Sequence, residues 1–516
     1  MKHLLTLLCL FCTIHLQAQP LKILSQKTLG GIGNDGANDL LLEPNGDIVL
    51  AGYSDSTSRS VASFIEQGWV VKLDANMNQK WSTYIGGSKY DYLQKIIKTS
   101  SNNYLAVGHT TTAIGTKTTG GYWAVMLDSN GTLLWQNRYG GSDSDYANDV
   151  AETDHHKFLI VGQTASKDGD VTHYKGGQSD GWVICIDSIG HLLWQKTYGS
   201  DSNLDFIFSI KKTKDNDFMM LGRAGANNGD VPISSRPNNL WFLKIDSLGT
   251  ILLNKTFGGS DREQGFCFSA TQDGGYILAG DNTSTNGDCS SNYGGHDAWI
   301  LKLDSLGNLQ WQKSYGGSND DFAYGSVIQR KKGTYVSVGI SSSGDHDAVG
   351  NHLVGQRGIF DILVIEFDSV GKVLNSHCFG GRNSENLPRV VELDDSTLLL
   401  SATTNSTDGD VLGNHGGTDA WLVVLRNSST TSVSPEKLQQ QIKIYPNPAS
   451  NKLHLELPAN EDFQIEMMDV LGRKISIKSS KNSKGYDLDV EGLLPGIYVL
   501  KVYNGLGSFQ FKFSKE

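Results

Sequence analysis

The stretch WVICIDSIGHLLWQKTYGS at residues 182–200 recurs along most of the chain and decides its fold. It joins two strand-like runs by the tight turn Asp187-Ser-Ile-Gly190, a pattern typical of a β-hairpin. Copies of it begin at six other positions: Trp69, Trp123, Trp241, Trp299, Leu363 and Trp421. The copies start 54 to 64 residues apart, and a period of this length indicates a repeat architecture.

Each repeat holds four strand-like segments, because two more runs precede each copy of the hairpin. In the third repeat these runs are residues 146–154 and 157–164. Four antiparallel strands per repeat, with no run of helical periodicity, predict the blades of a β-propeller.

The two ends of the repeat region predict the number of blades. The seventh repeat stops at Arg426 without its fourth strand, and residues 21–29 near the N-terminus repeat the missing segment. A strand from the N-terminus that completes the last blade removes two open sheet edges. We therefore predict an all-β, seven-bladed propeller over residues 19–426, with four-stranded blades and an N-terminal strand that closes the last one.

The repeats resemble a class of bacterial β-propeller repeats in two segments. These are WSTYIGGSKYDY at residues 81–92 and IVLAGYS at residues 48–54. The resemblance implies the propeller fold and says little about activity, because propellers carry many functions.

The N-terminus is typical of a secretory signal peptide. Lys2 and His3 precede an apolar run, residues 4–16, that is too short to span a bilayer. We predict a signal peptide over residues 1–18, cleaved between Ala18 and Gln19. A lipoprotein anchored through Cys12 is the alternative.

After a polar linker at residues 427–440, residues 441–516 hold short alternating segments with Gly and Pro at the turns. This pattern predicts a small Ig-like β-sandwich. Three motifs stand out in it, YPNP, DVLGR and PGIY, and they contain Tyr445, Pro446, Asn447, Pro448, Gly472, Arg473, Gly496 and Tyr498.

In order and position, these motifs resemble the type A C-terminal sorting domain of the type IX secretion system. The resemblance implies a partner, the type IX secretion machinery. It also implies a route through the periplasm and the outer membrane, after which the protein is secreted or attached to the outer surface. The alternative is an accessory Ig-like domain that binds carbohydrate.

Composition excludes some partners. The formal net charge of −11 disfavours nucleic acid and anionic membranes, and no later stretch is long and apolar enough to cross a membrane. Four cysteines follow the predicted signal peptide. Cys267 and Cys289 could form a disulfide, although buried free thiols are the favoured interpretation.

An acid follows the glycine pair of every repeat at nearly the same spacing. Such a carboxylate can accept backbone N–H bonds in the turn between blades, so we interpret these acids as structural. The alternative is a ring of acids that binds cations near the mouth of the channel. The seven residues are Asp35, Asp91, Asp145, Asp205, Glu263, Asp321 and Glu385.

Several loops between the second and third strands contain Asp-Gly-Asp or a close variant. Their oxygens are of the type that Ca²⁺ prefers, so calcium is a possible cofactor. The full spaced ligand set of an EF-hand is missing, and tight turns also favour Asp and Gly. The candidate ligands are Asp168, Asp170, Asp345, Asp347, Asp408 and Asp410.

No motif in the sequence identifies a catalytic residue, because hydrolase elbows, zinc-binding helices and phosphate loops are all missing. We expect a non-catalytic binding or adhesion protein for a glycan or a cell-surface protein. Loops on a rigid scaffold often carry binding, and the longest loop, residues 340–362 with Asp345, His346 and Asp347, is the predicted contact. The alternative is a secreted propeller enzyme that acts on extracellular polysaccharide through two of its many carboxylates.

Overall fold

The computed structural model describes residues 21–55, 66–87, 90–114, 120–201, 204–225, 228–232, 238–352, 358–427, 442–457, 463–470, 473–482, 484–504 and 507–516. Ala18, Gln19 and Gly472 lie outside these residues, as does all of the predicted linker except Asn427. The described residues form strands and turns and no helix. They make two compact units, divided between Asn427 and Ser428.

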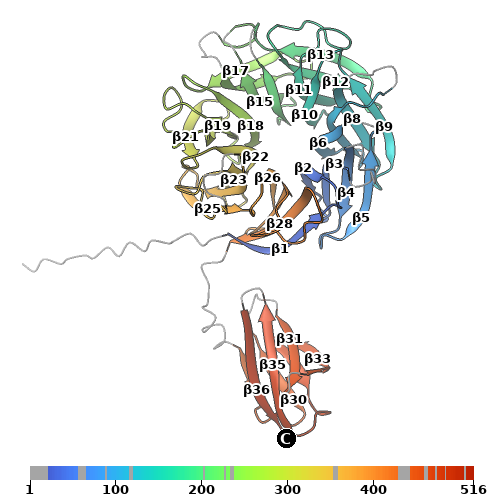
Figure 1. Cartoon of the computed structure of the whole chain (residues 1–516), viewed down its shortest axis with the longest axis vertical. Helices are drawn as coiled ribbons and strands as arrows, with labels where there is room; N and C mark the ends of the chain where they lie inside the picture. The colour runs from blue at the N-terminus through green and yellow to red at the C-terminus, as the bar shows by residue number, and fades with distance from the viewer. Residues whose placement is uncertain are drawn as a thin grey trace, which may run out of the picture. The chain divides into compact units, whose positions relative to one another are not determined.

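The first unit consists of seven four-stranded antiparallel sheets arranged around a central axis, which confirms the predicted propeller (Figure 1). In six of the sheets the strands follow chain order from the axis outward. Blade 1 contains β2 (Asp35–Leu42), β3 (Ile48–Ser54), β4 (Gln67–Leu73) and β5 (Gln79–Ile85). Blade 2 contains β6 (Asp91–Lys98), β7 (Tyr104–Thr110), β8 (Gly121–Leu127) and β9 (Leu133–Tyr139).

The next four blades repeat this order. Blade 3 contains β10 (Asp145–Glu152), β11 (Phe158–Thr164), β12 (Asp180–Ile186) and β13 (Leu192–Tyr198). Blade 4 contains β14 (Phe206–Lys212), β15 (Phe218–Ala224), β16 (Asn239–Ile245) and β17 (Ile251–Phe257). Blade 5 contains β18 (Glu263–Ala270), β19 (Tyr276–Asn282), β20 (Asp297–Leu303) and β21 (Leu309–Tyr315). Blade 6 contains β22 (Asp321–Gln329), β23 (Tyr335–Ser341), β24 (Asp361–Phe367) and β25 (Val373–Phe379).

Blade 7 joins the two ends of the propeller sequence. It contains β26 (Glu385–Glu392), β27 (Thr397–Thr404), β28 (Asp419–Asn427) and, as its outer strand, β1 (Leu21–Leu29). Strand β1 pairs with β28 in antiparallel register from Leu21↔Asn427 to Leu29↔Ala420. The ring is therefore closed by the N-terminal strand, as the sequence predicts.

Six of the seven hairpin copies begin with a tryptophan, which is fully or almost fully buried between neighbouring blades. Trp182 of blade 3, for example, packs in one cluster with Leu105 and Val107 of blade 2. Its indole N–H also donates to Gln195 on the adjacent outer strand at 2.8 Å. The closing strand reproduces this bond, because the indole of Trp421 donates to Gln26 at 2.9 Å. These side chains are core, so they offer no surface to a ligand.

The second unit is a sandwich of two four-stranded antiparallel sheets around one core. Leu455 and Leu488 of one sheet and Leu500 and Val502 of the other meet in this core. The first sheet contains β29 (Lys443–Tyr445), β30 (Lys452–Glu456), β34 (Gly485–Asp489) and β33 (Ser479–Asn482). The second contains β32 (Lys474–Ile475), β31 (Gln464–Asp469), β35 (Gly496–Asn504) and β36 (Gly507–Lys515).

Deleting residues 21–29 should lower the melting temperature of the propeller by on the order of 10 °C, because β28 then exposes an unpaired edge and blade 7 loses part of its core. Thermal unfolding followed by circular dichroism measures the shift. A control that lacks only the residues before Leu21 keeps β1 and should melt like the full chain. Equal melting temperatures for both deletions would show that ring closure contributes nothing to stability.

Candidate functional site

The seven turn acids lie at the junctions between blades, and each is at most 1% exposed. At every junction the carboxylate accepts the backbone N–H of the second residue of the glycine pair, over 2.7 to 3.1 Å. Asp145, for example, accepts this bond from Gly141 at 3.0 Å and a second bond from the hydroxyl of Ser166 at 3.0 Å. These carboxylates hold the backbone of the turn that leads into the next blade.

The first glycine of the pair is required by close approach. Gly140 has a φ of 142°, and a Cβ at this position would lie 2.2 Å from Oδ2 of Asp145. A Cβ on Gly30 would lie 2.1 Å from Asp419 and 2.8 Å from Asp35. Any other residue would push the carboxylates of the junction apart.

The Asp-Gly-Asp loops bind the same turns. Asp168 accepts the backbone N–H of Ser142 at 2.7 Å, and Asp170 accepts that of Gly140 at 2.9 Å. Asp408 and Asp410 repeat these bonds one-to-one at the start of blade 7, over 2.8 and 3.2 Å.

The longest loop follows the same arrangement in part. Asp345 accepts the N–H of Ser318 at 2.8 Å, and the N–H of Asp347 donates to the carbonyl of Gly316 at 3.0 Å. Among the described residues, no group of three or more His, Cys, Asp or Glu side chains is placed to hold one metal ion. The calcium site stays a prediction, and the described bonds give five of the six carboxylates another role.

A further acid at the junctions escapes the sequence analysis. It begins the third strand of four blades, two residues before the hairpin copy, as Asp180, Asp297, Asp361 and Asp419, and each is at most 1% exposed. One carboxylate oxygen of Asp180, of Asp297 and of Asp419 has no hydrogen-bond partner among the described residues. The signal in the sequence is the Asp-x-Trp that recurs at the start of three of these copies, with Asp-x-Leu in the fourth.

Burial and neighbouring acids raise the pKa of these junction carboxyls. Burial, with Asp205 adding to it, raises the pKa of Asp180 to about 7. Burial, with the nearby charge of Asp321, raises that of Asp297 to about 7. Burial raises the pKa of Glu385 to about 7 and that of Asp321 to about 6. At pH 5 these groups are largely neutral, which suits carboxyls packed beside one another.

The propeller should be more stable at pH 5 than at pH 8. These four carboxyls have a higher pKa in the folded chain than in the unfolded chain, so folding is linked to proton binding. The stability they contribute is complete below about pH 4 and is lost as the pH rises through 6 to 7. Melting curves at pH 5 and pH 8 measure the difference.

Two variants isolate this effect from other titrating groups such as His109, whose pKa burial lowers and which acts in the opposite sense. Asp297→Asn removes the charge and should shrink the difference between the two melting temperatures. Asp345→Asn is the matched control, because the Ser318 amide lowers the pKa of Asp345 and leaves it ionised at both pH values. Asp297→Asn with an undiminished difference would contradict the assignment.

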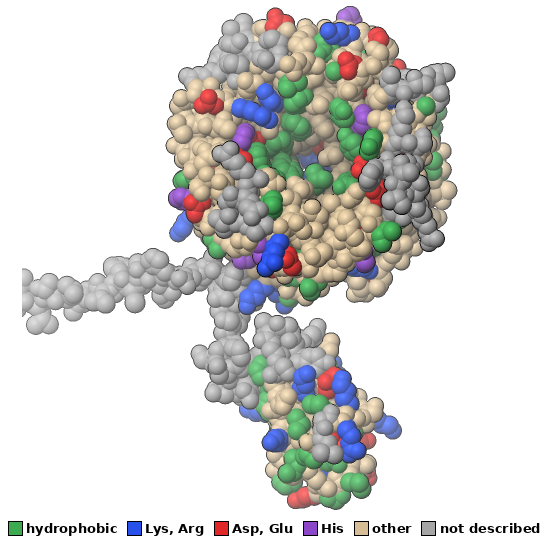
Figure 2. Space-filling view, in the orientation of Figure 1, with side chains coloured by type: hydrophobic (Ala, Val, Ile, Leu, Met, Phe, Trp, Pro, Cys, Tyr) green, Lys and Arg blue, Asp and Glu red, His purple; other side chains and the backbone are tan. Residues whose placement is uncertain are grey.

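A cavity of about 350 Å³ lies on the propeller axis, where Figure 2 shows hydrophobic side chains gathered around a central hollow. The inner strands of blades 2 to 7 supply nearly all of its wall. Each inner strand has a β-bulge in its pairing; in β10 the register shifts between Ala147 and Asp149. Such a bulge re-aims side chains of the strand, and Asn148 at this bulge lines the cavity. The lining residues are Tyr92, Gln94, Tyr146, Ala147, Asn148, Gln163, Phe208, Phe266, Tyr324, Leu387 and Arg389.

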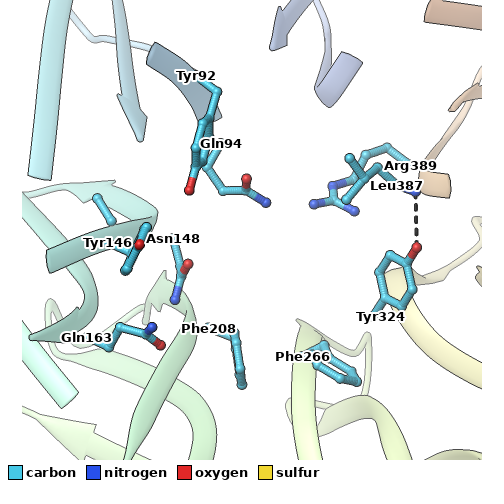
Figure 3. Close-up of a pocket in the computed structure, with 11 residues that line it drawn as sticks. Tyr92, Gln94, Tyr146, Asn148, Gln163, Phe208, Phe266, Tyr324, Leu387 and Arg389 are labelled. Atoms are coloured by element: carbon cyan, nitrogen blue, oxygen red, sulfur yellow. Dashed lines mark hydrogen bonds between the residues drawn. The ribbon is translucent and has the colours of Figure 1, made fainter. Parts of the chain in front are cut away.

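One side of the cavity is aromatic. Phe208, Phe266 and Tyr324 follow one another around the axis, with ring centroids 5.2 and 5.9 Å apart (Figure 3). The hydroxyl of Tyr324 accepts the backbone N–H of Leu387 at 3.2 Å, which fixes the ring. Tyr146 stacks on His109 at 4.3 Å. These rings are half-buried, so part of each faces the cavity.

The rest of the wall is polar. Gln94 and the guanidinium of Arg389 point toward one another from β6 and β26, and Gln163 lies beside Asn148 (Figure 3). Among the described residues, no side chain or backbone group forms a hydrogen bond with the amides of Gln94 and Gln163. Apolar surface with a few convergent polar groups is the usual composition of a small-molecule site.

The cavity was not expected from the sequence. The described residues of the loop predicted to make the partner contact do not line it: Asp345 binds a turn, and His346 stacks on Tyr293 at 5.0 Å. Residues 353–357 of this loop lie outside the described residues. All four described cysteines are free thiols, so Cys267 and Cys289 are not bridged.

The sorting motifs hold local structure in the second unit. The side-chain carbonyl of Asn447 accepts the N–H of Ser514 at 2.9 Å, and both Pro446 and Pro448 follow cis peptide bonds. Tyr445 donates its hydroxyl to Glu456 at 2.9 Å and remains 44% exposed. In the DVLGR motif, Arg473 donates to Asp469 at 2.7 Å. In the PGIY motif, which contains Gly496, Tyr498 donates to the carbonyl of Leu494 at 2.8 Å.

Comparison with protein families identifies this second unit. Residues 443–516 match the family described as secretion system C-terminal sorting domain. The unit is a type IX sorting domain. Its presence implies that the protein is secreted. In the part of the chain that the structure describes, no helix has the length and apolar composition to span a bilayer.

Likeness to other proteins is remote over the propeller. The regulatory protein FlaEY of Caulobacter vibrioides is 28% identical over an alignment of 206 residues, 36% of this chain, and the chain spans 21% of that protein. The Pan2 WD40 domain of Neurospora crassa aligns with 80% of this chain and 97% of its own, at 9% identity and a TM-score of 0.44. A DUF4221 protein of Bacteroides vulgatus aligns with 80% and 99%, at 10% identity and a TM-score of 0.35.

Proposed function

We propose that this secreted protein is a non-catalytic binding protein whose propeller takes up its ligand in the central cavity. The observation that carries the proposal is the composition of the cavity wall, where aromatic rings face free amides and one guanidinium. Rings supply apolar contact area at low entropic cost, and the amides fix orientation.

The same wall argues against a polysaccharide-cleaving enzyme. Glycoside hydrolysis normally needs two carboxyl groups on either side of the scissile bond. The lining residues include no Asp and no Glu, and the carboxylates of the junctions hold backbone amides instead. Binding is therefore the better supported function.

Variants of the cavity test this proposal. Phe266→Ala and Gln163→Ala should each weaken binding about tenfold or more on a glycan array, because each removes a contact that a bound ligand makes. Leu248→Ala is the control, since Leu248 is 68% exposed in the β16–β17 turn and away from the cavity. Both cavity variants must retain the parent melting curve.

Loss of binding in Leu248→Ala, with full binding in both cavity variants, would move the site to the turns. Full binding in all three variants would refute the cavity as the binding site. A variant with a shortened 340–362 loop would then test that loop.

We propose further that the signal peptide directs the chain to the periplasm and that the sorting domain directs it across the outer membrane, to be released or attached at the surface. Support comes from the sorting family and from the charged, apolar-cored leader. Cleavage between Ala18 and Gln19 and a processing site within residues 427–440 belong to this proposal.

Deleting residues 442–516 should retain a folded propeller in the periplasm, because the two units are separate compact bodies with separate cores. Immunoblots of periplasm, outer surface and medium measure the distribution. Arg389→Gln in the full chain controls for a general effect of mutation and should be exported normally. A truncated chain that reaches the surface at parental levels would refute the role of the sorting domain.

A further inference from the structure

Three cationic side chains from three blades lie at or near the central cavity. Arg389 of blade 7 lines its wall, and Lys95 of blade 2 and Lys211 of blade 4 project from the inner strands nearby. Two carboxylates accompany them, Asp39 and Asp149. The inner strands therefore place three bases and two acids around the channel, in a chain whose formal net charge is −11.

Backbone amides and the lysines occupy the two carboxylates. Asp39 accepts the N–H of Ile96 at 3.0 Å and pairs with Lys95 at 2.9 Å, but its distance to Nε of Arg389 is 3.7 Å. Asp149 likewise accepts the N–H of Ile210 at 2.9 Å and lies 3.6 Å from Lys211. The acids are nearly buried, whereas Arg389 is only loosely paired.

Lys95 and Asp149 favour their charged forms. Burial lowers the pKa of Lys95, but the carboxylates of Asp39 and Asp149 outweigh it and raise that pKa above its ordinary value. Burial raises the pKa of Asp149, and Lys211 and Lys95 bring it below its ordinary value. The ion pairs around these two residues thus stabilise the charged form of each of them.

A thiol on blade 5 lies near the same cations. Cys267 lies on β18, and burial raises the pKa of its thiol to about 11. Arg389, Lys211 and Lys95 all act on this thiol in the opposite sense, favouring its anion. All three cations therefore lie within electrostatic range of this one thiol.

Arg389 is the cation of this group that can donate further hydrogen bonds to a ligand. One terminal nitrogen donates to the carbonyl of Pro388 at 2.9 Å. Among the described residues, no acceptor within hydrogen-bond distance faces its other terminal nitrogen, and the guanidinium points into the cavity (Figure 3). A guanidinium presents paired N–H groups that match the two oxygens of a carboxylate or the oxygens of a sulfate.

We infer that the cavity binds an acidic sugar unit of a glycan, with its carboxylate or sulfate on Arg389. The sugar ring lies against Phe208, Phe266 and Tyr324, whose faces suit the C–H surface of a pyranose. The amides of Gln94 and Gln163 bind its hydroxyl groups, and so does the side-chain carbonyl of Asn148, whose Nδ2 donates to the carbonyl of Ile207 at 2.9 Å. The inference rests on the proposed binding function and names its ligand class.

A peptide ligand fits these observations less well. An acidic side chain would also pair with Arg389, but it offers no ring of hydroxyl groups to the three amides. The cavity volume of about 350 Å³ falls at the lower end of small-molecule sites, roughly 300 to 1,000 Å³, and accommodates a terminal unit rather than a folded segment.

Direct titration of the full chain with defined probes tests the inference. The probes are tri-galacturonic acid, its methyl ester, a sulfated galactose trisaccharide and tri-glutamate. Isothermal titration calorimetry should show at least tenfold tighter binding of one acidic saccharide than of the neutral ester, with the preference reduced at high salt. Tri-glutamate should bind no better than the ester.

Variants assign the preference to the cavity. Arg389→Gln should abolish the advantage of the acidic probe, and Arg389→Lys should restore part of it because charge returns without the planar fork. Phe266→Ala should weaken acidic and neutral probes alike. Arg382→Gln is the matched control, since the Arg382 side chain is 81% exposed in the turn before β26.

The outcomes separate the two proposals. Equal binding of acid and ester, both lost in Phe266→Ala, overturns the acidic ligand and keeps the binding function. Tighter binding of tri-glutamate than of either acidic saccharide replaces the glycan by an acidic peptide and overturns the inference. No binding of either acidic saccharide also overturns it, and a blank glycan array in addition removes the proposed function.

Discussion

The hydrogen bond from the N–H after the first glycine to a buried carboxylate is the constraint on which the whole ring depends. It recurs at all seven junctions with nearly one length, 2.7 to 3.1 Å. At the four junctions where this bond is buried, an amide without its acceptor would cost about 1 to 3 kcal/mol. Because a closed ring needs equal angles between blades, seven equal turns matter more than the strength of any one of them.

This constraint also determines which acids are available for function. The turn acids and the Asp-Gly-Asp loops already accept hydrogen bonds from the junction backbone. The acids that recur most regularly in the sequence therefore stabilise the fold. The blades differ instead in their inner strands, three residues after the turn acid. This position holds an amide side chain in blades 2 and 3 and an aromatic one in blades 4, 5 and 6: Gln94, Asn148, Phe208, Phe266 and Tyr324. Regular junctions thus support an irregular cavity.

The ring of blades was predictable because the sequence repeats once per blade. The cavity was not predictable. Residues 21–29 repeat the outer strand, so closure follows from comparing segments of one chain. The cavity depends on a bulge, which breaks the period of two by which sequence patterns place side chains. Asp297 was missed for a related reason. In the sequence it precedes Trp299 as an ordinary strand residue, and its proximity to Asp321 across the junction is visible only in the structure.

Closure by the first strand has a consequence for export. Gln26 and Trp421, which bond across the closing pair, are separated by 395 residues, so this pair forms only after almost the entire propeller sequence is present. Contacts of such separation form slowly, and until then β28 and blade 7 keep an open edge. The sorting domain has a separate core and follows β28 in the chain, so it folds without waiting for the ring. Folding of the sorting domain is therefore independent of ring closure, the step that completes the propeller.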